Sequence, residues 1–171
     1  MDIQSLVSSV PVEGEVILEG LDFVSNGEEY LTFILGDEHY GVDILKVKEI
    51  RGWENPTLIP NSPDYVKGVI NIRGTIIPIV DLRIRFGVGE VNYSPSTVVI
   101  VLTVEVADRV RMMGFVVDAV SDVLNAERSQ IKSAPAFGIN IPSVMIEGLV
   151  NVNDTVVTIL ASEQLLNLEE E

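Results

Sequence analysis

Side chains that could carry out catalysis are scarce in this chain. It has one histidine, His39, and no cysteine, so a thiolate metal site, a cysteine nucleophile and a disulfide are all excluded. A lone histidine in a predicted hairpin turn is usually an exposed residue and not a general base. Asp118 and Asp122 lie four residues apart, but on a strand they would be well separated along one face. The sequence therefore predicts a protein that is not an enzyme and that holds no cofactor or metal ion.

The strongest candidate for binding is Arg73, because a guanidinium offers five hydrogen-bond donors in a planar fork that suits carboxylate and carbonyl acceptors. It stands in the middle of VKGVINIRGTIIPIV, residues 66–80, where two β-branched runs flank a polar pair in the pattern of a β-hairpin. A turn does not need an arginine. We therefore expect Arg73 to project from the hairpin tip toward a partner, with an internal salt bridge to Asp81 or Glu49 as the alternative.

The same hairpin pattern occurs twice in the chain. Residues 66–80 align without a gap with residues 146–160, IEGLVNVNDTVVTIL, and the four identities are Gly68 with Gly148, Asn71 with Asn151, Thr75 with Thr155 and Ile79 with Ile159. A weaker match pairs residues 41–50 with residues 114–123 in the same order. The second hairpin turns on Asn153-Asp154, residues that accept positive φ, in place of Arg73-Gly74. We infer an internal duplication in which one half has been specialised.

Composition and turn signals indicate an all-β protein. Val and Ile supply 45 of the 171 residues and aromatic residues only 10, as expected for a β-rich interior of branched aliphatic side chains. Strands are expected on both sides of turns at Gly36-Asp37, Arg73-Gly74, Ala107-Asp108 and Asn153-Asp154, and prolines mark a loop over residues 52–64. Asp81 and Ser162 are the expected N-caps of two short helices, the second near the C-terminus. Many short strands in a duplicated pattern fit two small barrels better than one sandwich.

The net charge of −15 is unevenly distributed. Residues 1–29 contain seven acidic and no basic residues, and residues 169–171 add three acids, which predicts a flexible acidic leader and an acidic tail around a folded body, residues 30–168. The body has a net charge of −5 and few aromatics, whereas a small-barrel nucleic-acid binder would present a basic face interleaved with aromatic residues. The sequence shows neither a secretory signal nor a membrane span. We expect a cytoplasmic protein that does not bind nucleic acid and does not insert directly into a membrane.

Four segments of the chain resemble the CheW family of chemotaxis coupling proteins: YLTFILGDEHYGVDILKVKEIRGW, PDYVKGVINIRGTIIPIVDLRIRFG, TVVIVL and GFVVDAVSDVL. The resemblance covers residues 30–168 and implies two pseudo-symmetric five-stranded SH3-like β-barrels with a short C-terminal helix. It also implies a non-enzymatic adaptor that joins the cytoplasmic tip of methyl-accepting chemotaxis receptors to the regulatory domain of the histidine kinase CheA. Such a protein is recruited to membrane-associated receptor arrays. The alternative is a CheW-like coupling module of another chemosensory pathway, for example pilus motility.

The resemblance also implies contact residues. The receptor-contact positions of the family fall on Val47, Glu49, Arg73, Val120 and Val123, and the kinase-contact region falls on Lys67 and Gly68. A receptor tip is a helical hairpin, so a groove with valine walls would accept its apolar stripe. Arg73 and Glu49 at the rim of that groove would set the register through charge-assisted hydrogen bonds. The stretch VEVADRVRMM is longer than the compact turn expected for the family at that place.

Overall fold

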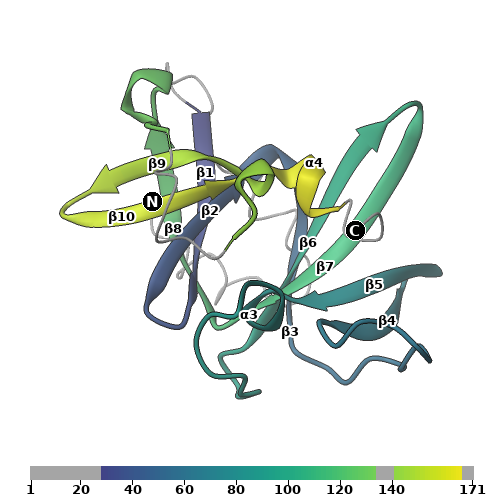
Figure 1. The fold of residues 1–171 in the computed structure, drawn as a ribbon. Helices are drawn as coiled ribbons and strands as arrows, with labels where there is room; N and C mark the ends of the chain where they lie inside the picture. Colours follow the sequence, from purple (N-terminus) through teal and green to yellow (C-terminus); the bar gives the residue numbers. More distant parts are fainter. Residues whose placement is uncertain (1–27, 134–140, 167–171) are drawn as a thin grey trace.

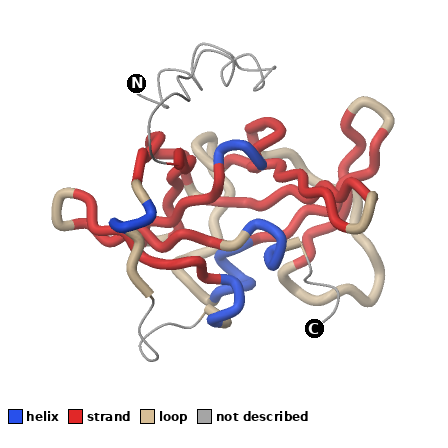
Figure 2. The backbone as a smooth tube through the Cα atoms, turned by 90° about the horizontal axis from the view of Figure 1, so that it is seen from above, coloured by secondary structure: helices blue, strands red, loops and turns tan. Residues whose placement is uncertain are grey.

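Ten β-strands make up most of the computed structural model, which describes residues 28–133 and 141–166 (Figure 1). The helices are short: α3 covers Leu82–Phe86, α4 covers Ser162–Leu165, and the 3-10 turns η1, η2 and η3 cover Ile44–Lys46, Arg128–Gln130 and Ser143–Met145. Figure 2 shows the same predominance of strand over helix along the backbone. The predicted all-β class is therefore confirmed. The predicted acidic tail and nearly all of the predicted leader lie outside the described residues.

The strands form two five-stranded sheets, with the spatial orders β8-β1-β2-β10-β9 and β3-β6-β7-β5-β4. Their bounds are β1 Glu28–Leu35, β2 Glu38–Asp43, β3 Val47–Gly52, β4 Val66–Ile72, β5 Thr75–Asp81, β6 Val98–Val106, β7 Arg109–Val117, β8 Ala119–Ala126, β9 Ile146–Val152 and β10 Thr155–Leu160. They correspond to the two SH3-like barrels that the sequence predicts. We call β3–β7 the central barrel, and β1, β2 and β8–β10 the terminal barrel.

Each repeat of the sequence contributes strands to both barrels. The repeats correspond to β1–β5 and β6–β10, and each barrel combines the first two strands of one repeat with the last three of the other. The parallel pairings that join the repeats are equivalent as well: Ile79 pairs with Gly114 in the central barrel, and Ile159 pairs with Gly41 in the terminal barrel. The duplication therefore produces two intertwined barrels of the same topology.

The largest apolar cluster contains residues of both barrels. Among its members are Phe33 and Tyr40 of the terminal barrel and Phe86 and Phe115 from α3 and the central barrel, all at most 2 % exposed. Smaller clusters fill the interior of each barrel. Because apolar burial stabilises by about 25 cal/mol per Å², the shared cluster holds the two barrels together as one unit.

Two boundaries add detail to the predicted pattern. β1 begins at Glu28, two residues before the predicted start of the folded body, because β8 is long enough to pair Glu28 with Ala126. The pairing of β6 with β7 continues as far as Val106 and Arg109 and closes at the predicted turn, Ala107-Asp108. Figure 1 shows this hairpin projecting beyond the central barrel, which accounts for the extra length noted in the sequence.

The two predicted helix caps have different outcomes. Asp81 caps α3, since its carboxylate accepts a backbone N–H two residues later at 3.0 Å. The prediction for Ser162 is wrong by one residue: Ala161 is the N-cap of α4 and Ser162 is the first helical residue. The repeat explains the shift, because the Ala161 N–H donates to the carbonyl of Met145 as the Asp81 N–H donates to that of Tyr65, both at 2.8 Å. Sheet pairing, and not the preference of serine for caps, decides where α4 begins.

Candidate functional site

Glu49 and Arg73, two of the predicted contact residues, lie in direct contact with each other. Glu49 is on β3 and Arg73 is at the tip of the β4–β5 hairpin, and Arg73 Nη1 lies 2.9 Å from Glu49 Oε2. The other carboxylate oxygen of Glu49 accepts a hydrogen bond from Arg51 Nη1 at 3.0 Å. The internal salt bridge left open by the sequence is therefore present, and it goes to Glu49. Asp81 is paired with Arg83 instead.

The two partners of this salt bridge differ greatly in burial. The side chain of Glu49 is 4 % exposed, whereas that of Arg73 is 56 % exposed. A buried carboxylate must be paired to offset the hydration that it loses, so Glu49 depends on its arginines. Arg73 keeps more than half of its side-chain surface in solvent. One side of Arg73 thus has a structural contact, and the rest of the side chain is accessible to a partner.

The backbone of Arg73 adopts a conformation that arginine does not favour. Its φ is 50° and that of Gly74 is 89°, while Asn153 and Asp154 in the equivalent turn have φ values of 49° and 67°. Asparagine and aspartate tolerate this left-handed region far better than bulkier residues, for which it costs about 1–2 kcal/mol. An arginine at this position is therefore explained by its side-chain contacts and not by the turn.

A small pocket adjoins the salt bridge in the central barrel. Its volume is about 150 Å³, and we call it the Glu49 pocket. It is lined by Lys48, Glu49, Ile72, Arg73, Thr75, Ile77, Val101 and Met112. The aliphatic side chains and the methionine come from β4–β7, and the charged ones come from β3 and the hairpin tip. The pocket therefore offers a partner an apolar surface beside a guanidinium group.

The three predicted valines lie apart from this pocket. Val47 and Val120 are 5 % and 8 % exposed and belong to the cluster shared by the two barrels. Val123 is partly buried against that cluster and lines a different pocket, in the terminal barrel. The structure therefore brings Glu49 and Arg73 together at one pocket, while Val47 and Val120 are core residues beneath the surface.

The predicted kinase-contact residues lie on β4. Lys67 is partly exposed, and Gly68 is at a β-bulge with φ 138°. A Cβ atom on Gly68 would lie 2.1 Å from the carbonyl oxygen of Thr57, a distance that no side chain can occupy. Thr57 pairs here with Val69 as an isolated bridge, which attaches the proline-rich loop to the barrel. Gly68 is thus required by the fold whatever else it contacts.

Comparison with known proteins identifies the family. The profile of the CheW-like domain matches residues 29–170. The chain belongs to the CheW-like family. It is 46 % identical over 144 residues to the chemotaxis protein CheW of Klebsiella aerogenes, covering 84 % of each chain, and 31 % identical to that of Bacillus subtilis, covering 85 % and 91 %.

Among solved structures, the scaffolding protein TtCheW from Thermoanaerobacter tengcongensis has a TM-score of 0.72 and 30 % identity, covering 82 % of this chain and 88 % of that one. The predicted CheW family, the predicted fold and the role of chemotaxis coupling adaptor are all confirmed by these matches. They favour chemotaxis over another chemosensory pathway.

A fully buried arginine of this CheW-like chain was missed by the sequence analysis. The side chain of Arg83 is 0 % exposed and forms salt bridges with Asp81 at 2.8 Å and Asp118 at 2.7 Å. Burial alone would lower the pKa of Arg83, but hydrogen bonds to the two carboxylates raise it above its ordinary value. The Tyr93 hydroxyl donates to Asp81 at 2.8 Å, and burial together with this bond raises the pKa of Tyr93 to about 12. The signal in the sequence was the arginine two residues after the expected cap.

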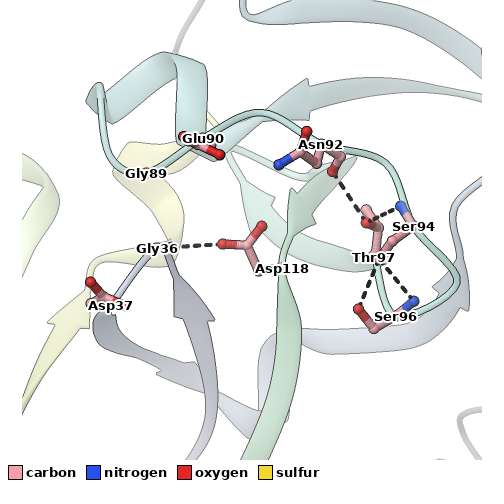
Figure 3. A pocket seen from close by; sticks show the side chains of 9 residues that line it. All are labelled: Gly36, Asp37, Gly89, Glu90, Asn92, Ser94, Ser96, Thr97 and Asp118. Carbon is pink, nitrogen blue, oxygen red and sulfur yellow. Dashed lines mark hydrogen bonds between the residues drawn. The ribbon is translucent and has the colours of Figure 1, made fainter.

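A polar pocket of about 700 Å³ lies beside this network (Figure 3). Asp118 Oδ1 accepts from Arg83 and Oδ2 accepts the Gly36 N–H at 2.6 Å, so this carboxylate connects α3 with the turn between β1 and β2. Ser94, Ser96 and Thr97 hydrogen-bond to one another in the loop opposite. These bonds lie within the loop, and Arg83 Nη1 connects the loop to α3 by donating to the Asn92 carbonyl at 2.7 Å. We assign this pocket a structural role.

His39 does not lie in a turn as the sequence suggested. It is the second residue of β2, paired with Ile34 and Val157, and it is partly buried. Within residues 28–133 and 141–166, no three His, Cys, Asp or Glu side chains are grouped as a metal site would require. None of the helices in the same ranges is long and apolar enough to cross a bilayer.

Proposed function

We propose that this protein joins the cytoplasmic signalling tip of methyl-accepting chemotaxis receptors to the regulatory domain of the histidine kinase CheA, and that it is recruited in this way to membrane-associated arrays. Membership of the CheW-like family supports an adaptor between these components. The observation that carries the receptor assignment is Arg73, a half-exposed guanidinium held beside an apolar pocket in a backbone conformation unfavourable for arginine. A charge beside an apolar surface suits the amphipathic face of a helical receptor tip.

The predicted receptor-contact residues take two roles in this proposal. Arg73 and Val123 are exposed enough to contact the receptor. Val47, Glu49 and Val120 are buried and act from beneath, since Glu49 holds the guanidinium and the valines hold β3 and β8 in the shared core. Substitution of the buried residues would disturb the contact surface through the strands that present it.

The proposed kinase-contact surface is the part of β4 around Lys67. Lys67 is partly exposed and carries a positive charge on a protein of net charge −15, while Gly68 keeps the bulge that orients it. This surface and the Arg73 tip lie at opposite ends of the same strand. An adaptor needs such separate contacts, because it must hold two partners at once.

The kinase contact is tested by calorimetric titration of the full chain with the purified regulatory domain of its cognate CheA in physiological salt. We expect saturable one-to-one binding that Lys67→Glu weakens. Lys132→Glu makes the same charge change at an exposed lysine outside β4 and should leave binding unchanged. Absence of binding by a chain with a native circular dichroism spectrum would contradict the proposal.

The receptor contact is tested by reconstituting kinase activation with receptor, CheA and either Arg73→Ala or Asn153→Ala. Both variants truncate the same position of equivalent turns, so they separate the guanidinium from the turn. We expect Arg73→Ala to lower receptor-dependent kinase activity severalfold, with kinase binding retained, and Asn153→Ala to keep it. Equal activities for the two variants would rule out Arg73 as the receptor contact.

A further inference from the structure

The Glu49 pocket has a counterpart in the terminal barrel. Its volume is about 250 Å³, and we call it the Asp122 pocket. It is lined by Thr32, His39, Ser121, Asp122, Val123, Leu124, Val152, Asn153, Thr155 and Val157. Eight of these residues correspond to the eight that line the Glu49 pocket. Seven follow from the aligned repeats: His39 to Met112, Ser121 to Lys48, Asp122 to Glu49, Val152 to Ile72, Asn153 to Arg73, Thr155 to Thr75 and Val157 to Ile77. The eighth is Thr32, which contacts Asp122 as Val101 pairs with Glu49. The duplication has therefore produced the same pocket twice.

The carboxylate is kept in both pockets, but the cations around it are not. The Glu49 carboxylate is ion-paired with Arg51 and Arg73, and Lys48 also lines the pocket. At the equivalent positions of the Asp122 pocket, Lys48 is replaced by Ser121, Arg51 by Leu124 and Arg73 by Asn153. One pocket thus has an internal excess of positive charge and the other presents a carboxylate among neutral polar and apolar groups.

The backbone holds Asp122 in place in its pocket. Thr32 Oγ1 donates to the Asp122 carbonyl at 2.8 Å and accepts the Asp122 N–H at 2.9 Å. The side chain of Asp122 is exposed and accepts the N–H of Val123 at 2.8 Å. A carboxylate has about four acceptor sites, and the Val123 N–H uses one of them. These bonds therefore hold Asp122 in a fixed orientation. Its carboxylate retains acceptor sites of the kind that Glu49 uses to bind its arginines.

We propose that the Asp122 pocket binds an arginine side chain of a partner protein. The guanidinium would occupy the place that Arg73 takes beside Glu49, with Asp122 accepting its fork and Val123, Leu124 and Val152 contacting its aliphatic stem. The protein's own hairpin shows that this barrel geometry accommodates an arginine. The Asp122 pocket is also the larger of the two, about 250 Å³ against 150 Å³, as expected where the hairpin supplies a short asparagine.

Arginine fits this pocket better than lysine does. A guanidinium is planar and can donate two parallel hydrogen bonds to one carboxylate, whereas an ammonium is a compact and strongly hydrated charge. Ser121 and Asn153 line the same pocket, and their side-chain oxygens can accept hydrogen bonds from the remaining donors. The partner is therefore a protein segment that presents an exposed arginine, as the Arg73 hairpin itself does.

The test is an NMR titration of the ¹⁵N-labelled full chain at neutral pH with N-acetyl-arginine amide, and with N-acetyl-lysine amide as the matched control. We expect saturable shifts at the amides of Asp122, Val123 and Asn153, with a dissociation constant on the order of millimolar for so small a ligand, and binding of the lysine compound at least fivefold weaker. Shifts of equal size with both compounds, or none at these amides, would overturn the proposal.

Four variants make the test specific. Asp122→Asn should abolish the shifts, and Arg73→Ala should create a second site for the same compound at Glu49, which serves as a positive control. Asn153→Arg supplies the guanidinium from the protein's own hairpin, so it should weaken binding at least fivefold. Asn151→Arg makes the same charge change on exposed β9 outside the pocket and should leave binding unchanged. Unaltered binding in Asp122→Asn would also overturn the proposal. Because Asp122 is exposed, this substitution should not destabilise the fold.

Discussion

The β4–β5 and β9–β10 hairpins share a backbone and differ in chemistry. Gly68 pairs with Ile79 in one and Gly148 with Ile159 in the other, next to a register shift at the base of each hairpin. Both turns have two consecutive residues at positive φ. Only one tip carries an arginine. The two turns keep the same backbone conformation with different tip residues, so the backbone does not dictate the arginine.

The helices that follow these hairpins differ in the same way. Asp81 caps α3 and pairs with the buried Arg83, whereas the equivalent positions at α4 are Ala161 and Glu163. The first repeat therefore has two groups of ion pairs, one at Glu49 and one at Arg83, that the second lacks at equivalent positions. One is at the surface and the other joins the barrels, so substitutions can measure what each contributes.

Arg83→Met should produce the largest effect. Removing this guanidinium leaves the buried carboxylate of Asp81 without its cation, which costs about 3–5 kcal/mol in buried ion pairs of this kind. Urea unfolding should show that loss, whereas Glu163→Met, at the equivalent position of α4, should change stability by less than about 0.5 kcal/mol. Similar free energies of unfolding for the two variants would mean that the two helices are not differentiated as described.

Gly68→Ala should have the next largest effect, and Gly148→Ala provides its matched control. Alanine at Gly68 combines a positive φ with a backbone clash, so we expect a loss of about 1–3 kcal/mol in urea unfolding. At Gly148 the added Cβ would lie 2.4 Å from the side chain of Ile131, which can move, and 2.8 Å from the carbonyl oxygen of Lys132. This backbone clash is milder than the one at Gly68 and comes without a positive φ, so the loss should be smaller. The reverse order would show that the positive φ and the contact with Thr57 do not determine the cost at Gly68.

A double-mutant cycle on Glu49→Gln and Arg73→Ala should give a coupling free energy of about 1 kcal/mol, because Arg73 is half exposed and Arg51 remains to pair with Glu49. The cycle is measured by urea unfolding. The corresponding cycle on Asp122→Asn and Asn153→Ala should give a coupling near zero. A coupling at the second pair as large as at the first would mean that the Asp122 pocket already has an internal partner.

Sequence predicted the fold well because turns and β-branched runs are local signals. The hairpins around Arg73, Ala107 and Asn153 were located from them, and the cap at Asp81 was found from its side chain and position. The interleaving of the repeats in two barrels was not predicted, because strand patterns do not show which strands pair across the chain. The position of Ser162 was wrong for a related reason, since long-range pairing displaced the cap.

The candidate site was predicted in part. The contrast between Arg73 and Asn153 identified the guanidinium, and Glu49 was named as its possible internal partner. Whether Val47 and Val120 line a groove or lie in the core could not be decided from sequence, because a valine on a strand looks the same in either place. The Asp122 pocket could not be predicted from sequence, because residues from different strands line it and their equivalence to those of the Glu49 pocket appears only in three dimensions.

The smallest effect is expected from Tyr93→Phe, and it appears at alkaline pH. Burial and the hydrogen bond to Asp81 raise the pKa of Tyr93 from 10 to about 12. Since the folded-state pKa is raised, its contribution to stability is complete below pH 10 and is lost as the pH rises to 12. Urea unfolding followed by the fluorescence of Trp53, whose ring stacks on Tyr93 at 4.2 Å, should therefore show a shallower loss of stability in the variant over this range. Tyr30 and Tyr40 are present in both proteins and cancel in the comparison. Equal slopes would mean that the hydroxyl of Tyr93 does not take part in the buried network that distinguishes the first repeat from the second.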